Sequence, residues 1–262
     1  SNGRNLKIDL MFGFLNNLPQ VTKNILLLNI MFFVVTLFLE SQGVDLIQTL
    51  GVHHILSPKF EPYQIVTHFF MHAGFFHIFF NMWLFVMLGG YLERIWGPQR
   101  FFIFYFASAM GSFLLYNAVG YNEMLNLINE LNANNISVAE LNAIIINNND
   151  EGFNELIIQN QSNSQLIKDY AALSFVPMVG ASGAIFGVMA AFTILFPNTE
   201  FYLYFAIPVK AKYLVGVYFV YEVYMSVAAP NDGTAHLAHV GGAIVGAIIV
   251  LIWRRTDRQN FY

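Results

Sequence analysis

Six long apolar segments constrain this chain more than any other feature of its sequence. A helix needs roughly 20 apolar residues to cross the hydrocarbon core of a bilayer. Six segments approach that length, at about residues 24–39, 75–92, 101–119, 181–196, 213–229 and 237–253. Only 11% of the residues are charged, whereas a soluble domain carries about 25%. The sequence therefore predicts an all-α polytopic membrane protein with a six-transmembrane-helix bundle.

The lysines and arginines of the loops predict an orientation. With six spans and a cytoplasmic N-terminus, ten of them fall on the inner side and two, Lys59 and Lys168, on the outer side. Such an excess is typical of cytoplasmic loops. The inner residues are Arg4, Lys7, Lys23, Arg94, Arg100, Lys210, Lys212, Arg254, Arg255 and Arg258. We expect a bacterial inner-membrane protein with both termini in the cytoplasm.

This orientation divides the chain into three parts. Residues 1–23 form a cytoplasmic segment, residues 24–253 a membrane domain and residues 254–262 a cytoplasmic tail. The first apolar segment has no small-residue cleavage site after it, so we expect a retained anchor instead of a signal peptide. The long loop at residues 40–74 is rich in aromatic residues and histidine. Its apolar stretches are too short to cross, so we expect it to pack against protein at the outer leaflet.

Residues 120–172 form an Asn-rich insertion on the outer side. Ser137 and Glu140 match a helix capping box, and apolar residues recur at helical spacing in Met124, Leu127, Ile128 and Leu131. These patterns predict two short amphipathic helices on the outer rim, joined by Asn-rich loops. A flexible low-complexity spacer is the alternative.

Polar side chains occur at one depth in three of the predicted spans. Spans two, four and six all run from outside to inside. Span two begins with His77 and Asn81, span four with Ser182, and span six with His239. Polar groups within a membrane are costly and often functional. We therefore expect these four side chains to converge just below the outer surface.

Small residues would allow spans four and six to approach closely. Gly183 and Gly187 are four residues apart in span four, and Gly242 and Gly246 repeat that spacing in span six. A serine needs a neighbouring base to act as a nucleophile at neutral pH. His239 could be that base for Ser182. The chain has no cysteine, which excludes thiolate and disulfide chemistry.

An acyl-transfer site also needs donors for the oxyanion. His77 and Asn81 share one helix face, and the backbone N–H of Ser182 at a helix start could add a third donor. Phe186, one turn below Ser182, could stack on the ring of His239. The spans hold two acidic residues, Glu93 at an inner end and Glu222 inside span five. Neither is an evident third member, so we expect a Ser-His dyad.

The sequence resembles the rhomboid family of intramembrane serine proteases over nearly its whole length. The resemblance lies in HFFMHAGFFHIFFN, GGYLER, GASGAIFG and AHVGGAIVG. It implies Ser182 as nucleophile, His239 as general base, and His77 and Asn81 as the oxyanion hole. The supporting residues would be Gly180, Gly183, Phe186, Gly242 and Gly246. It further implies cleavage of transmembrane protein substrates within the lipid bilayer, with no cofactor, no metal and no nucleic acid.

Two features depart from the family pattern. A Trp-Arg pair common in the first loop is replaced by Tyr63 and Gln64, and the insertion at residues 120–172 is longer than the core fold needs. Neither touches the dyad. The short outer loop at residues 230–234 could act as a lid.

Other functions remain open from the sequence. Ser182 could be only an interhelical contact. His68 and His72 are spaced like metal ligands, but no carboxylate accompanies them and H-E-x-x-H is absent. We expect structural roles for His53, His54 and His236. A small transporter would favour internal repeats and broken helices at the midplane, which are not visible. A non-proteolytic rhomboid-like factor that binds membrane proteins is the closer alternative.

Overall fold

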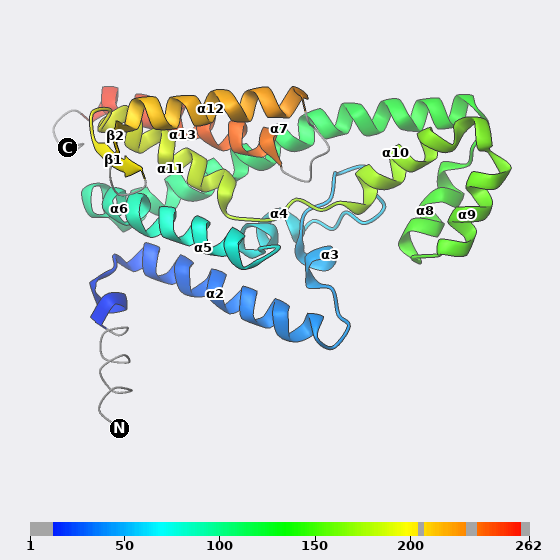
Figure 1. Cartoon of the computed structure of the whole chain (residues 1–262), viewed down its shortest axis with the longest axis horizontal. Helices are drawn as coiled ribbons and strands as arrows, with labels where there is room; N and C mark the ends of the chain where they lie inside the picture. The colour runs from blue at the N-terminus through cyan, green and yellow to red at the C-terminus, as the bar shows by residue number, and fades with distance from the viewer. Residues whose placement is uncertain (1–12, 204–206, 229–234, 258–262) are drawn as a thin grey trace.

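A computed structural model describes residues 13–203, 207–228 and 235–257. Each predicted span corresponds to helix, and the all-α polytopic membrane fold is confirmed (Figure 1). The helices are α2 (Gln20–Glu40), α5 (Phe75–Leu84) continued by a π-helical turn (Phe85–Gly89) and α6 (Gly90–Trp96), α7 (Pro98–Ala133), α11 (Ser182–Leu195), α12 (Ala211–Ala228) and α13 (His236–Thr256).

Four helical segments of the described chain are long and apolar enough to cross a membrane. They are Gln20–Glu40, Phe75–Trp96, Pro98–Ala133 and His236–Thr256. The helix α11 is apolar but has only 14 residues, and α12 is not among the four. The number of six spans therefore stays a prediction.

The helix α11 lies at the centre of the bundle, packed against α7 and α13. Glycine makes this packing possible. A Cβ atom placed on Gly242 would lie 1.8 Å from the backbone oxygen of Gly183, and one on Gly246 would lie 2.6 Å from the Cα of Gly187. Real Cβ atoms do not approach other atoms so closely. The close approach predicted from the two glycine pairs is confirmed.

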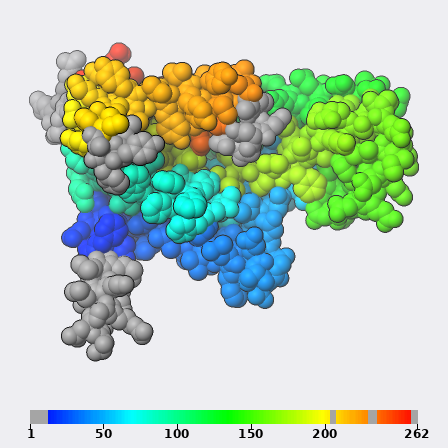
Figure 2. Space-filling view, viewed as in Figure 1, coloured from blue at the N-terminus to red at the C-terminus, as the bar shows by residue number. Residues whose placement is uncertain are grey.

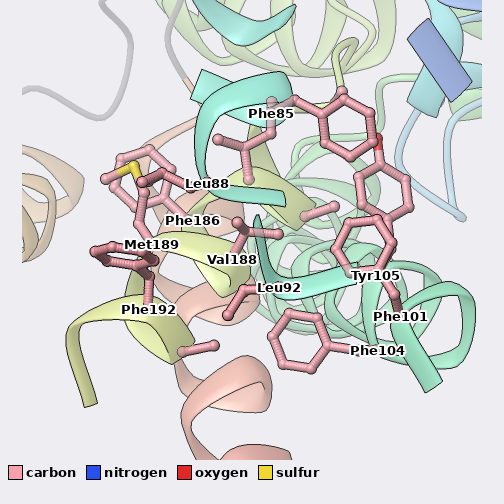
Figure 3. Close-up of a cluster of buried hydrophobic side chains, with 14 of the residues drawn as sticks. Phe85, Leu88, Leu92, Phe101, Phe104, Tyr105, Phe186, Val188, Met189 and Phe192 are labelled. Atoms are coloured by element: carbon pink, nitrogen blue, oxygen red, sulfur yellow. The ribbon is translucent and has the colours of Figure 1, made fainter. Parts of the chain in front are cut away.

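Large side chains fill the rest of the bundle interior. Figure 3 shows aromatic and aliphatic side chains from the π-helical turn, α6, α7 and α11 packed together. Phe85, Leu92, Phe101, Phe104 and Tyr105 are fully buried among them. Interiors of this kind are close-packed, so they hold α11 firmly in place.

One buried carboxylate joins α2 to α6. Glu93 accepts hydrogen bonds from the backbone N–H of Val21 at 2.8 Å and of Thr22 at 2.7 Å, and from the Thr22 hydroxyl at 2.7 Å. These N–H groups at the start of α2 have no partner within the helix. Glu93 therefore caps the N-terminus of α2.

The loop between α2 and α5 packs against protein, as predicted. It contains α3 (Leu46–Leu50), α4 (Gln64–Thr67) and a 3₁₀ turn (His68–Phe70). Gln64, at the position that departs from the family pattern, is buried there. Its Oε1 accepts from the backbone N–H of His53 at 3.3 Å and of Glu61 at 3.1 Å, while its Nε2 donates to the carbonyls of Thr49 and Lys59. The loop is therefore organised around the Gln64 amide.

The insertion differs from the prediction of two short helices. Span three does not end near residue 119, because α7 continues unbroken to Ala133. Three further helices follow, α8 (Val138–Ile146), α9 (Asp150–Gln159) and α10 (Ser164–Phe175), with a 3₁₀ turn (Gln161–Asn163). The predicted cap is confirmed, since Ser137 Oγ accepts from the backbone N–H of Glu140 at 3.2 Å.

These helices and the end of α7 form an insertion lobe with its own apolar core, built on Met124, Leu131, Leu141, Ile167 and Tyr170. A flexible spacer is thereby excluded. In Figure 2 the insertion lobe extends beyond the bundle, and in Figure 1 it lies at the opposite end of the molecule from a short hairpin of β1 (Glu200–Leu203) and β2 (Ile207–Lys210). Arg4, Lys7, Arg258 and the proposed lid at residues 230–234 lie outside the described residues.

Candidate active site

The serine at the start of α11 lies beside a histidine of α13. Nε2 of His239 is 2.8 Å from Oγ of Ser182, a hydrogen-bond distance. Ser182 is the first residue of α11, and His239 lies in the first turn of α13. Both helices are held together by the glycine contact described above. The predicted contact between the two side chains is therefore present.

The His239 ring is fixed from one side by an aromatic side chain. Phe186, one turn along α11 from Ser182, stacks on it with ring centroids 4.4 Å apart and an interplanar angle of 8°. His239 is only 9% exposed. This stacking, predicted from the sequence, leaves the ring little freedom to turn away from Ser182.

Gly180 lies next to Ser182 and leaves space beside its hydroxyl. Its φ of +117° is a conformation that side chains disfavour, and its N–H donates to the carbonyl of His68 at 2.9 Å. A Cβ atom added there would lie 3.0 Å from Nε2 of His77 and 3.6 Å from Oγ of Ser182. His77 and Ser182 therefore face the same small space next to Gly180.

Asn81 brings an unused donor to the same face of α5. Its side chain is 8% exposed, and its Nδ2 has no hydrogen-bond partner in the described part of the chain. Buried amide groups are normally paired, so a free N–H₂ of this kind is typical of a site that awaits a ligand. The backbone N–H groups at the start of α11 are also free of intrahelical partners.

Two histidines of the first loop, His68 and His72, lie next to residues of the site. His68 is paired through Nδ1 with the carbonyl of Gln64 at 2.8 Å. The ring of His72 lies edge-on to that of His77, 4.9 Å between centroids. Burial, with a contribution from the charge of His77, lowers the pKa of His72 to about 3. His72 is consequently a neutral neighbour of the site at physiological pH.

The structure places a carboxylate beside His239, which the expected Ser-His dyad does not include. Oε2 of Glu222 on α12 lies 2.9 Å from Nδ1 of His239 and 2.6 Å from Nδ1 of His236. His236, for which the sequence indicated no partner, thus shares this carboxylate. These three side chains are also the one group in the described chain whose ligand atoms are close enough to hold a metal ion. The sequence held a signal for this cluster, because a carboxylate lies inside a predicted span and two histidines are three residues apart on another.

The arrangement has the parts of an acyl-transfer site. It combines a hydroxyl next to an imidazole with a second imidazole, that of His77, which borders the same small space. Asn81 contributes an unpaired amide one turn further along α5. Such donors can stabilise a developing negative charge.

Comparison with known proteins shows a match to one protein family. The rhomboid domain model matches residues 59–138 and 151–256, which is more than half of the chain. The gap between these matches falls within the insertion lobe.

Individual relatives agree with this match. A mitochondrial RHOMBOID-like protein 12 of Arabidopsis thaliana is 27% identical over 76% of this chain and 48% of its own length. Rhomboid-like protease 1 of Toxoplasma gondii is 29% identical over 41% of this chain and 39% of its own. An inactive RHOMBOID-like protein 8 of Arabidopsis thaliana is 38% identical over 22% of this chain and 16% of its own.

The chain spans about half or less of the length of these relatives. The Arabidopsis protein with the longest of these matches is named as mitochondrial, as is an uncharacterised rhomboid protein of Schizosaccharomyces pombe. These names do not fit the bacterial inner membrane expected from the sequence.

Proposed function

Because the chain belongs to the rhomboid family, we propose that it is an intramembrane serine protease that cleaves peptide bonds in or near transmembrane segments of other proteins. One observation supports this most: the 2.8 Å contact between Oγ of Ser182 and Nε2 of His239, next to the ring of His77. A serine that served only as an interhelical contact would need neither imidazole.

In the proposed reaction, a substrate helix unwinds locally and presents a peptide bond to Ser182. Ser182 Oγ attacks the carbonyl carbon while its proton moves to Nε2 of His239. His77, Asn81 and N–H groups at the start of α11 stabilise the oxyanion. His239 then protonates the leaving amine, and water hydrolyses the acyl-enzyme. Small or helix-weak residues at the cleavage site favour the unwinding.

The membrane and orientation belong to this proposal. The loop charges support a multi-pass protein with both termini on the cytoplasmic side and an active site that opens to the outer face. The bacterial inner membrane stays our proposal, although two relatives are named as mitochondrial. Fusing a reporter to the C-terminus, at residue 262, tests the orientation directly.

Labelling with a fluorophosphonate probe in detergent micelles tests the proposed nucleophile without knowledge of a natural substrate. The wild type is expected to label, Ser182→Ala to show no label, and His239→Ala to label far more slowly. Equal labelling of the wild type and Ser182→Ala would assign the reaction to another residue and overturn the proposal.

Asn81→Ala is expected to reduce kcat by about 10²- to 10³-fold, because losing one oxyanion donor raises the barrier by about 2.7–4 kcal/mol. The measurement is the cleavage rate of a single-span substrate under saturating conditions. Asn29→Ala is the matched control, since Asn29 is a buried asparagine of α2 whose Nδ2 donates to Ile25 within its own helix. A near-normal rate for Asn81→Ala would remove Asn81 from the mechanism.

A non-proteolytic binding factor is the second candidate, favoured by the similarity to an inactive relative. It would bind membrane proteins without cutting them. The intact pair of Ser182 and His239 argues against it. Binding of a single-span substrate without any cleavage by the wild type would favour this candidate over the protease.

A further inference from the structure

An ionisable side chain lies buried in the bundle, on the side of His239 away from Ser182. Glu222 on α12 is 2% exposed. Carboxylates inside membrane segments are costly unless they are paired, and they often mark a functional site. The catalytic steps proposed above do not use Glu222. Its position therefore needs its own explanation.

Two imidazoles of α13 donate to this carboxylate. His236 and His239 are three residues apart and so share a helix face. Their Nδ1 atoms lie 2.6 Å and 2.9 Å from the same oxygen, Oε2 of Glu222. A carboxylate only accepts hydrogen bonds, so both Nδ1 atoms carry the proton. In neutral His239 this leaves Nε2 unprotonated, facing the Ser182 hydroxyl at 2.8 Å.

We propose that Glu222 is a positioning residue that holds His239 in the Nδ1–H tautomer and stabilises its protonated form, while His236 holds the Glu222 carboxylate in place. The proposal rests on the proposed protease function. When Ser182 attacks, its proton moves to Nε2 of His239, and the Nδ1 proton stays on His239. The ring then carries a positive charge next to the negative charge of Glu222, and the proton leaves later with the amine product.

The geometry favours hydrogen bonds over a bound metal at these three side chains. Ligand atoms around tetrahedral zinc lie roughly 3.3 Å apart, given bonds of about 2.0–2.1 Å. The separations of 2.6 Å and 2.9 Å are shorter than that and match charge-assisted hydrogen bonds. Zinc bound to Nδ1 would also fix the proton of neutral His239 on Nε2, the wrong nitrogen for a base. Activity unaffected by a chelator is the expected result.

Glu222→Gln is the main test. Replacing the carboxylate with an amide removes the charge and allows the wrong tautomer of His239. The expected result is a kcat about 10²- to 10⁴-fold lower, with KM for a single-span substrate nearly unchanged. Glu222→Asp keeps the charge and is expected to recover part of the lost activity. A purely structural role would not produce this difference between kcat and KM, nor this rescue.

Glu93→Gln is the matched control, since Glu93 is the other buried carboxylate of the described bundle, is 3% exposed and accepts hydrogen bonds from the start of α2. It is expected to lower the melting temperature without lowering kcat. The proposal is supported if the Glu222→Gln variant has the melting temperature of the wild type but a lower kcat. Glu222→Gln with wild-type kcat overturns it.

Histidine ¹⁵N spectra give a readout independent of substrate. In the wild type, the His239 signal, assigned by its loss in His239→Ala, is expected to be that of the Nδ1–H tautomer. Glu222→Gln is expected to shift it toward Nε2–H, and His236→Phe to do so partly. An unchanged spectrum in Glu222→Gln overturns the proposal. Fluorophosphonate labelling of Ser182 in the wild type separates this outcome from a failure of the protease function, because labelling would persist.

Discussion

Ser182→Ala is expected to reduce kcat for cleavage of a single-span substrate by about 10⁶-fold, as loss of a nucleophilic serine does in serine proteases. The reason is geometric. The structure places this one hydroxyl against Nε2 of His239 and next to the space lined by His77. The measurement is the appearance of the cleaved fragment in proteoliposomes that contain enzyme and substrate.

Ser112→Ala is the matched control for this substitution. Ser112 is a second buried serine near the site, on α7, and its Oγ would lie 2.1 Å from a Cβ added to Gly183. It makes no contact with His239 in the described chain. Activity is expected to remain within several-fold of the wild type. Cleavage that survives in Ser182→Ala, or disappears equally in both variants, would contradict the assignment of Ser182.

Gly242→Ala is expected to damage both the stability and the activity of the protein. The added Cβ would lie 1.8 Å from the backbone oxygen of Gly183, so α11 and α13 must move apart. Overpacking of this kind costs about 3 kcal/mol, which corresponds to a fall in Tm of roughly 6–12 °C. Because Ser182 and His239 sit on the two separated helices, their contact is lost as well. Thermal unfolding in detergent and fluorophosphonate labelling measure the two effects.

Gly216→Ala is the comparison for that variant. Gly216 lies on α12, and nothing is within 4 Å of a Cβ added there. Alanine is a better helix former than glycine by roughly 0.5–1 kcal/mol, so the Tm should stay equal or rise slightly. An unchanged Tm in Gly242→Ala would contradict the close contact between α11 and α13.

The main features of the site could be predicted because the chain direction of each span determines its depth. Ser182 and His239 both occur in the first turn of spans that run in the same direction, so they had to lie at one level of the bundle. The four-residue spacing of glycines in span four, from Gly183, and in span six, from Gly242, indicated that these two helices approach closely. The stacking of Phe186 followed from its position one turn beyond Ser182. Each of these inferences needed only local periodicity.

What could not be predicted depended on contacts between distant segments. The contact between Glu222 and His239 depends on the rotation of α12 about its axis. Tyrosine and aliphatic residues flank Glu222 on both sides in the sequence, so no clear polar or apolar face indicates this rotation. The sequence predicts an end to span three at residue 119, just before Gly120. In the structure it lies within α7, and a Cβ there would be 2.0 Å from the His54 ring. That glycine provides room for a side chain of the first loop and does not break the helix.

The unbroken course of α7 determines how the insertion lobe is mounted. With 36 residues and a rise of 1.5 Å per residue, the helix is about 54 Å long. One half supports the core of the lobe through Met124 and Leu131, and the other half carries Ser108 and Ser112 against the glycines of α11. The lobe is thus attached to the bundle by a continuous helix and not by a flexible linker. A displacement of the lobe would therefore act, along this continuous helix, on its contact with α11, the helix that begins at Ser182.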